Sequence, residues 1–281
     1  MSGWSRVDRG TRVFWKAVGR PVDLDADPWL RAPVHTAGPV GDGWLEEAAA
    51  SVGGTVVRDD PGAGLLPDLA VLDGPSFSAA ALHPLVRDFY EHTATWRMDA
   101  WSQWSPLAAP GGSLVAWAFG RRVQQLAIPV RPLDVSRGID SRVLPVRDAA
   151  GEQVWAGWLR RLRATDDVLF SGAYRSTGVP GREGACVHVA FPLEQGNVQV
   201  FLAPTARADG ALVLDSGPGR FGDPGAYVLV LDDAAAPHAA RVPVHERFAV
   251  FVDEEGVLRT DHDLRVGPVR SLRLHYRMTR A

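Results

Sequence analysis

The stretch Arg270-Ser-Leu-Arg-Leu-His-Tyr-Arg-Met-Thr279 alternates between two kinds of side chain. The apolar or aromatic side chains occupy one parity, at Leu272, Leu274, Tyr276 and Met278, and basic side chains occupy the other, at Arg273, His275 and Arg277. Because successive side chains of a strand point to opposite faces, this pattern predicts a strand with one buried face and one water-facing face. The pattern is typical of an antiparallel sheet that covers a core on one side.

Working back from this stretch, we find similar short segments as far as Thr95. The predicted strands lie near 95–104, 141–147, 153–163, 168–177, 185–192, 196–203, 210–216, 225–231, 242–253 and 257–266. Several connections carry hairpin residues: Gly196–Asn197, Asp209–Gly210 and Asp253–Gly256. With roughly eleven strands in sequence order, closure into a barrel is the simplest way to avoid two exposed sheet edges.

Helices are predicted near 43–52, near 84–93 after the first-turn Pro84, and near 113–126 after the first strand. We therefore expect a mainly β (α+β) fold. Its N-terminal helical segment, 1–94, would pack on an antiparallel β-barrel domain, 95–281, with one helix inserted after the first strand. In outline this resembles the fatty-acid-binding and lipocalin-type (calycin) barrels, a resemblance of topology alone.

The composition is that of an ordinary globular protein. Of the 281 residues, 46% are apolar and 22% are charged, with a formal net charge of −3. That charge gives no electrostatic reason to expect nucleic acid or an anionic membrane as partner. Cys186 is the only cysteine, and the N-terminal residues carry charges throughout, unlike a signal peptide. We therefore expect a cytoplasmic protein without a membrane span; the oligomeric state stays open.

The apparent motifs do not point to a cofactor or a metal. The G-x-G-x-x-G at Gly217–Gly222 is followed by another strand instead of a helix, so a turn is expected. In Asp261-His262-Asp263 the histidine points away from the face of the aspartates, and His83 and His92 are out of phase on one helix. We expect no cofactor and no metal site.

The densest chemistry lies between Phe89 and Trp104, where aromatic and ionisable side chains are mixed. Aromatic surface with a few polar groups suits the wall of a pocket for an amphipathic ligand. The candidate ligand-binding residues are Tyr90, His92, Arg97, Asp99, Trp101, Gln103 and Arg122, with His188 as a further candidate on a central strand. If Trp96, Met98 and Trp104 face the interior, the candidates on the opposite face of the same strand are all excluded from the pocket. These are Arg97, Asp99, Trp101 and Gln103.

Three functions remain open at this point. The first is a soluble β-barrel protein that binds a hydrophobic or amphipathic small molecule. The second is a cofactor-independent acid–base enzyme, such as an isomerase, cyclase or hydratase, working in an apolar barrel cavity. The third is a structural protein with a filled barrel. The deciding observation is a cavity of roughly 300 Å³ or more inside the barrel. A cavity with two or more converging polar groups would favour the enzyme, a purely apolar cavity would favour the binder, and no cavity would favour the structural protein.

Overall fold

The structure is a computed structural model that describes residues 4–35, 41–105, 138–163, 166, 168–232 and 235–281. Its helices are α1 (Trp4–Val18), α2 (Trp44–Ser51) and α3 (Pro84–Glu91). Its strands are β1 (Arg20–Pro21), β2 (Thr55–Val56), β3 (Trp96–Trp104), β4 (Ile139–Arg147), β5 (Gln153–Leu162), β6 (Val168–Thr177), β7 (Cys186–Leu193), β8 (Gly196–Ala206), β9 (Leu212–Asp215), β10 (Gly225–Asp232), β11 (Ala235–Val242), β12 (Val244–Val252), β13 (Leu258–Val266) and β14 (Val269–Arg280). Short 3₁₀ turns lie at Pro28–Leu30, Leu69–Leu72, Ala79–Ala81 and Thr93–Thr95.

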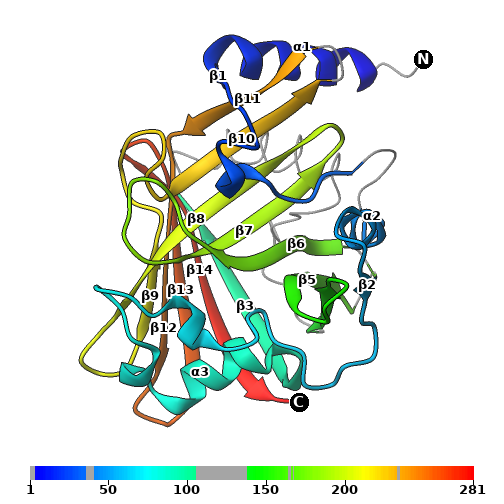
Figure 1. The fold of residues 1–281 in the computed structure, drawn as a ribbon. Coiled ribbons are helices and arrows are strands. Elements are labelled where there is room, and N and C mark those ends of the chain that lie inside the picture. Colours follow the sequence, from blue (N-terminus) through cyan, green and yellow to red (C-terminus); the bar gives the residue numbers. More distant parts are fainter. Residues whose placement is uncertain (1–3, 36–40, 106–137, 164–165, 167, 233–234) are drawn as a thin grey trace.

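The strands of the described residues form one sheet of fourteen strands, in which all pairings of named strands are antiparallel (Figure 1). The main path runs β2-β4-β5-β6-β7-β8-β9-β12-β13-β14-β3. Strand β14 pairs along its length with β3, from Leu272 opposite Trp104 to Arg280 opposite Trp96. The predicted antiparallel meander is therefore confirmed.

Strand β8 is a branch point of the sheet. One edge pairs with β7. The other edge pairs first with β10, over Gly196–Phe201, and then with β9, over Ala203–Ala206. Strand β10 continues outward to β11 and then to β1, so one corner of the sheet extends away from the main path and carries α1 above it (Figure 1).

The expected closure of the barrel is only approximate. Among the described residues, no strand pairing joins β3 to β4, the two strands at which closure would occur. One physical reason is visible at β4, because the short strand β2 pairs with its Val146–Arg147 end and occupies that part of its edge. The sheet curves round a core but is not closed.

Three strands were not predicted: β1, β2 and β11. Strands β1 and β2 have two residues each, too short for an alternating pattern. Strand β11 is rich in alanine and contains Pro237, residue types that are depleted in strands. Its backbone is nevertheless paired on both sides, with β10 and with β1, and this tertiary pairing decides its conformation.

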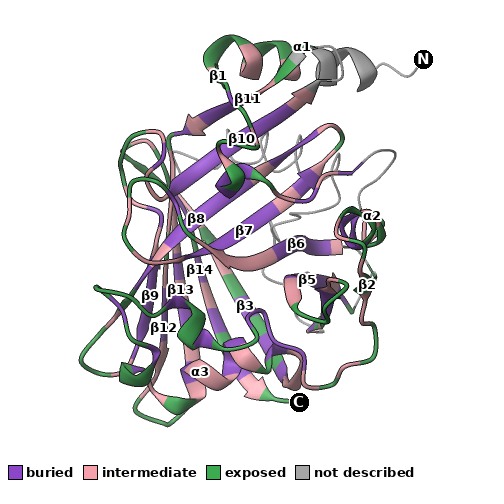
Figure 2. Ribbon diagram, viewed as in Figure 1, coloured by how far each residue is buried: buried purple, intermediate pink, exposed green. Residues whose placement is uncertain are grey.

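The core lies on both faces of the sheet, and buried residues follow the strands (Figure 2). The inner face encloses the largest cluster of buried residues, to which segment 63–90 also contributes Leu65, Leu69 and Phe89. The outer face is covered in two places. Helix α2 packs there through Trp44 and Leu45, and segment 22–30 packs there through Trp29.

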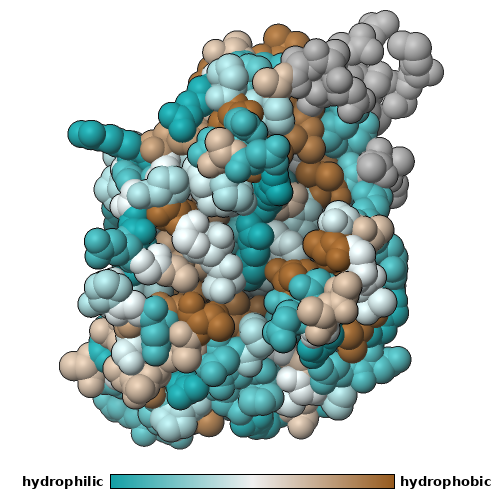
Figure 3. Space-filling model, in the orientation of Figure 1, coloured by the Kyte–Doolittle hydropathy of each residue, from teal (hydrophilic) through white to brown (hydrophobic). Residues whose placement is uncertain are grey.

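The predicted helices near 43–52 and 84–93 correspond to α2 and α3, whereas the predicted helix at 113–126 lies outside the described residues. The face of the molecule in Figure 3 mixes hydrophilic and hydrophobic patches. Within the described part of the chain, no helix is both long enough and apolar enough to cross a bilayer.

Candidate functional site

Strand β3 settles which of its faces is interior. Its buried residues are Trp96, Met98 and Ala100, and these belong to the inner core. The candidates on the other parity, Arg97, Asp99, Trp101 and Gln103, are exposed on the outer face, with Trp101 49% exposed. A strand cannot present both faces to one cavity, so these four do not line the interior.

The four outward side chains of β3 lie opposite polar residues of β14. Asp99 pairs in register with Arg277, and Gln103 pairs with Arg273. The Trp101 ring lies 6.0 Å from the ring of His275. These are water-facing contacts across neighbouring strands, which stabilise a sheet modestly.

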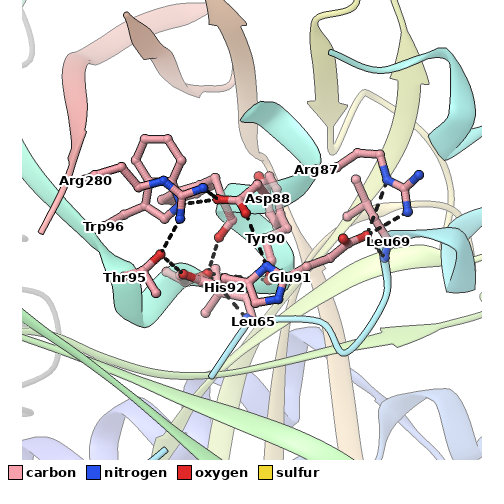
Figure 4. A network of polar contacts seen from close by, with 12 residues as sticks. Leu65, Leu69, Arg87, Asp88, Tyr90, Glu91, His92, Thr95, Trp96 and Arg280 are labelled. Atoms are coloured by element: carbon pink, nitrogen blue, oxygen red, sulfur yellow. Dashed lines mark hydrogen bonds and ion pairs between the residues drawn. The ribbon is translucent and has the colours of Figure 1, made fainter. Parts of the chain in front are cut away.

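Tyr90 and His92 belong to a network around α3 (Figure 4). Asp88 accepts a hydrogen bond from Trp96 Nε1 at 2.9 Å, forms an ion pair with Arg280 at 2.7 Å and lies 3.4 Å from His92 Nδ1. Tyr90 is buried, which raises the pKa of its hydroxyl. The network connects α3 to β14, and the carboxylate of Asp88 already has partners within it.

A groove of about 330 Å³ lies beside this network, outside the sheet interior. It is lined by Ala80, Leu82, Pro84, Arg87, Asp88 and Glu91. Its charged groups are also engaged: Arg87 lies 3.1 Å from Glu91, and Glu91 Oε1 accepts a hydrogen bond from Leu69 N. The groove therefore offers a ligand little unsatisfied hydrogen-bonding capacity. Candidate Arg122 lies outside the described residues.

His188 is fully buried on the outer face of the sheet, beneath segment 28–35. Arg175 Nε donates to His188 Nδ1 at 3.1 Å, which leaves the ring proton on Nε2, 2.8 Å from Gln199 Oε1. Gln199 Nε2 in turn donates to the carbonyl of Leu30. Burial first, and then the charge of Arg175, lower the pKa of His188 well below its ordinary value.

Both ring nitrogens of His188 are therefore occupied, and its ring stacks on Phe201 at 4.2 Å. The neighbouring thiol is no better placed for chemistry, because burial raises the pKa of Cys186 to about 11. A thiol in that state is mostly protonated at neutral pH and is a poor nucleophile. His188 instead bonds to Arg175 and Gln199, whose side chains donate to the carbonyls of Arg31 and Leu30 in the N-terminal segment.

The inner face holds a different polar cluster, centred on Arg160 of β5. Arg160 is only 8% exposed, and its guanidinium lies over the rings of Trp158, at 4.2 Å, and Phe170, at 4.4 Å. Its buried Nε has no hydrogen-bond partner. A buried, unpaired donor on a charged group is rare, since it costs about 1–3 kcal/mol or more.

Two tyrosines share this interior with Arg160. The Tyr276 ring lies 5.8 Å from the guanidinium, and Tyr174 packs against Trp158 and Phe170. Burial raises the pKa of both hydroxyls, while the positive charge of Arg160 acts in the opposite direction on both. Both hydroxyls remain protonated at neutral pH and can donate hydrogen bonds.

An acid–base pair lies on the facing strands. His262 Nε2 lies 3.1 Å from Glu246 Oε2, and the imidazole stacks on Phe248 at 3.8 Å. The other ring nitrogen, Nδ1, is buried without a partner. The negative charge of Glu246 raises the pKa of Tyr174 and of Tyr276, against the effect of Arg160.

The interior cluster was not among the predicted site residues, although the sequence carries a signal for it. Arg160 has the parity of Trp158 and Leu162, and His262 has the parity of Leu258. A charged side chain on the apolar parity of a strand points into the core. The prediction near β3 depended on the density of aromatic and ionisable residues along the sequence. That density does not show which face of the strand is buried.

The predicted turn at Gly217–Gly222 is confirmed. Gly217–Gly222 connects β9 to β10, and its amides bond to nearby side chains, as with Gly217 N and Asp215 Oδ1 at 2.6 Å. His262 faces inward while Asp261 contacts His275 at 2.8 Å on the outside. Within the described part of the chain, no three metal-ligating side chains gather in one place.

Comparison with known proteins gives one informative similarity. The chain is 26% identical over 225 residues to the "uncharacterized membrane protein YndJ" of Bacillus subtilis (strain 168). The aligned part is 77% of this chain but only 38% of that protein. No protein-family model matches the chain, and no solved structure matches it.

This similarity overturns the expectation of a cytoplasmic protein. The expectation depended on the charge of the N-terminal residues and on the shortness of the apolar runs, whereas the relative is named as a membrane protein. A membrane protein can carry large domains outside the bilayer, and the composition of such a domain says nothing of the membrane. The charge and the apolar runs of this chain therefore do not decide its location.

Proposed function

We propose that this chain binds a hydrophobic or amphipathic small molecule on the inner face of its curved sheet. The observation that carries the proposal is the buried Arg160, whose Nε has no partner although it lies among aromatic rings. Binding sites for small molecules are mostly apolar, with a few polar groups that orient the ligand. The inner face has this composition.

The aromatic lining is continuous. Rings lie in contact from Phe191 to Phe170 at 5.3 Å, and from Phe170 to Trp158 at 5.6 Å. Phe191, Val198 and Tyr174 pack against the inner core but are only partly buried. This is the part of the lining at which we propose that a ligand enters.

The relative supports a lipid-like ligand. A protein named as a membrane protein works next to a store of amphipathic molecules, and the proposed site combines an apolar wall with a charged group. The proposal concerns ligand binding by this chain and no activity of the whole relative, because the aligned part is only 38% of that protein.

The proposal is tested by native mass spectrometry of the purified chain before and after delipidation, followed by titration with hexadecanol. We expect a bound small molecule or saturable binding of the alcohol. Val198→Trp should weaken that binding by filling the accessible part of the interior. Val269→Trp, a matched change at an exposed strand position, should leave it unchanged. Absence of binding in the wild-type chain would refute the proposal.

A second candidate function is favoured by one observation, the His262–Glu246 pair in the same interior. A histidine oriented by a carboxylate, with its other nitrogen unpartnered, can act as a general acid or base. This pair is the observation that favours an acid–base enzyme as the second candidate. If it is correct, a bound compound recovered after incubation will have changed chemically, and His262→Gln will abolish that change without abolishing binding.

A further inference from the structure

The side of helix α1 that faces away from the sheet is apolar. Of the seven large apolar side chains that are exposed in the described part of the chain, three belong to this helix. They are Val13, 62% exposed, Phe14, 54% exposed, and Val18, 55% exposed. Positions 13, 14, 17 and 18 lie on one side of an α-helix, so these three and exposed Ala17 form one apolar surface. Single exposed apolar side chains are common, but a continuous group of them points to an interaction site.

The opposite side of α1 holds the helix on the body of the protein. Trp15 packs against the inner core, and Arg12 forms an ion pair with Glu194 at 3.4 Å. The helix ends at Gly19, whose amide donates to the carbonyl of Trp15 at 2.9 Å, and β1 then pairs with β11. The helix is therefore fixed in orientation, with its apolar surface directed away from the sheet.

Helix α1 also lies at one end of the molecule, beyond the corner of the sheet that β10, β11 and β1 form (Figure 1). No described element lies farther out at that end in this view. An extended flat partner can therefore contact the apolar surface of α1 while the fold stays as it is.

The charge of this segment differs from that of the chain as a whole. The chain has a net charge of −3, whereas residues 4–20 have five basic residues and one acidic residue, a net charge of +4. The basic residues are Arg6, Arg9, Arg12, Lys16 and Arg20, and the acidic residue is Asp8. An apolar surface on a helix rich in basic residues is typical of helices that lie in the interface of an anionic membrane.

The size of the apolar surface argues against a protein partner. A stable protein interface takes about 20–30 residues from each partner, and α1 offers four exposed apolar side chains. A second copy of this chain would also bring two segments of charge +4 together, which is unfavourable. A bilayer is different, because a few inserted apolar side chains and several basic residues are enough for reversible binding.

We propose that α1 is a docking surface for an anionic lipid bilayer. Val13, Phe14 and Val18 enter the interfacial layer of the lipid, and the basic residues of the segment face the lipid phosphates. The helix lies in the plane of the membrane surface and does not cross it. This docking is independent of the ligand proposed for the inner face of the sheet.

The experiment measures co-sedimentation of the full chain with vesicles of phosphatidylcholine alone and of phosphatidylcholine mixed with phosphatidylglycerol. The wild-type chain is compared with Phe14→Ser, Val18→Ser and Val71→Ser. Val71 is the matched control for Val18, since it is an exposed valine in the turn beside α3, at the other end of the molecule (Figure 1). Circular dichroism and thermal unfolding show whether each variant keeps the fold.

We expect the wild-type chain to bind the mixed vesicles at least about tenfold more tightly than phosphatidylcholine vesicles, because only the mixed vesicles carry a negative surface charge. Raising the salt from about 0.1 M to about 1 M should remove this preference, since the Debye length falls from about 10 Å to about 3 Å. Phe14→Ser and Val18→Ser should each weaken binding about fivefold to tenfold by removing one inserted apolar side chain. Val71→Ser should bind as the wild-type chain does.

Lys16 gives a measurement that needs no substitution. It is the only lysine of the chain, so the reaction of its side chain with an amine reagent can be followed by peptide mass spectrometry in the wild-type protein. Mixed vesicles should slow this reaction, because lipid then lies against α1, and phosphatidylcholine vesicles should not. If neither serine variant of α1 folds, this result decides the question.

Three results would overturn the inference. The first is no binding of the wild-type chain to the mixed vesicles, and the second is undiminished binding by folded Phe14→Ser and Val18→Ser. The third is a wild-type dimer that Phe14→Ser dissociates in analytical ultracentrifugation, which would show that a second copy covers the apolar surface. Each of them leaves the titration with hexadecanol unaffected, so the proposed function would stand.

Discussion

At the scale of single residues, His188 and Arg160 are both buried, basic and in contact with aromatic rings, yet their surroundings differ. His188 has partners for both ring nitrogens, whereas Arg160 lacks one for Nε. A satisfied polar network stabilises one conformation, and an unsatisfied charge is tolerated where function needs it. The contrast predicts opposite effects on stability when the two residues are replaced.

The first prediction concerns His188 and pH. Its pKa is lowered in the folded chain, so below about pH 6.5 the unfolded chain takes up a proton that the folded chain does not. The free energy of unfolding should therefore fall as the pH falls from about 6.5, by up to about 1.4 kcal/mol per pH unit from this residue. His188→Gln should be less stable at pH 7 but should show a shallower decline, as measured by urea unfolding. Parallel declines would contradict this account.

The second prediction concerns the stability of Arg160→Met. Replacing an unpaired buried charge with an apolar side chain of similar length removes an unfavourable term. We expect the free energy of unfolding to rise by about 1–2 kcal/mol, on the scale seen when strained functional residues are replaced. Arg175→Met is the comparison, because Arg175 donates to His188 and to the carbonyl of Arg31, so its loss should destabilise. A clear loss of stability in Arg160→Met would argue that this arginine is structural.

At the scale of elements, the contact between α3 and the preceding segment depends on Gly64. A Cβ there would lie 2.2 Å from the carbonyl oxygen of Glu91, a backbone atom that cannot move easily. We predict that Gly64→Ala costs about 1–3 kcal/mol, as overpacking does. Gly62→Ala, where the nearest atom is 3.6 Å away, should be nearly neutral. Thermal unfolding of the two variants gives the comparison, and equal melting temperatures would contradict it.

The elements that could be predicted from the sequence are those with a regular pattern. Strand β14 alternates as expected, and helix α3 begins at Pro84. Strand β11 could not be predicted, because its alanines and Pro237 favour no strand by themselves. For the site, parity places Arg160 and His262 inside, but only tertiary structure shows that strands far apart in sequence bring them together. The absence of a hydrogen-bond partner cannot be read from a sequence at all.

At the scale of the whole molecule, we still predict that residues 1–94 fold together with residues 95–281 as one unit. Leu69 and Phe89 lie in the inner core, and Trp44 Nε1 donates to Ser171 of β6 at 3.0 Å. We predict that a chain of residues 95–281 is less stable and less soluble than the full chain, since it exposes apolar surface on both faces. Equal stability and solubility of the two would contradict this, measured by denaturant unfolding and by sedimentation.

The pairing of β3 with β14 has a consequence during protein synthesis. Strand β3 leaves the ribosome well before its partner along residues 272–280 is made. Until then β3 carries Trp96 and Met98 without the neighbour that shields its edge, and contacts between such distant segments form slowly. Between the synthesis of β3 and that of β14, the unpaired edge of β3 is therefore open to wrong pairing with other strands.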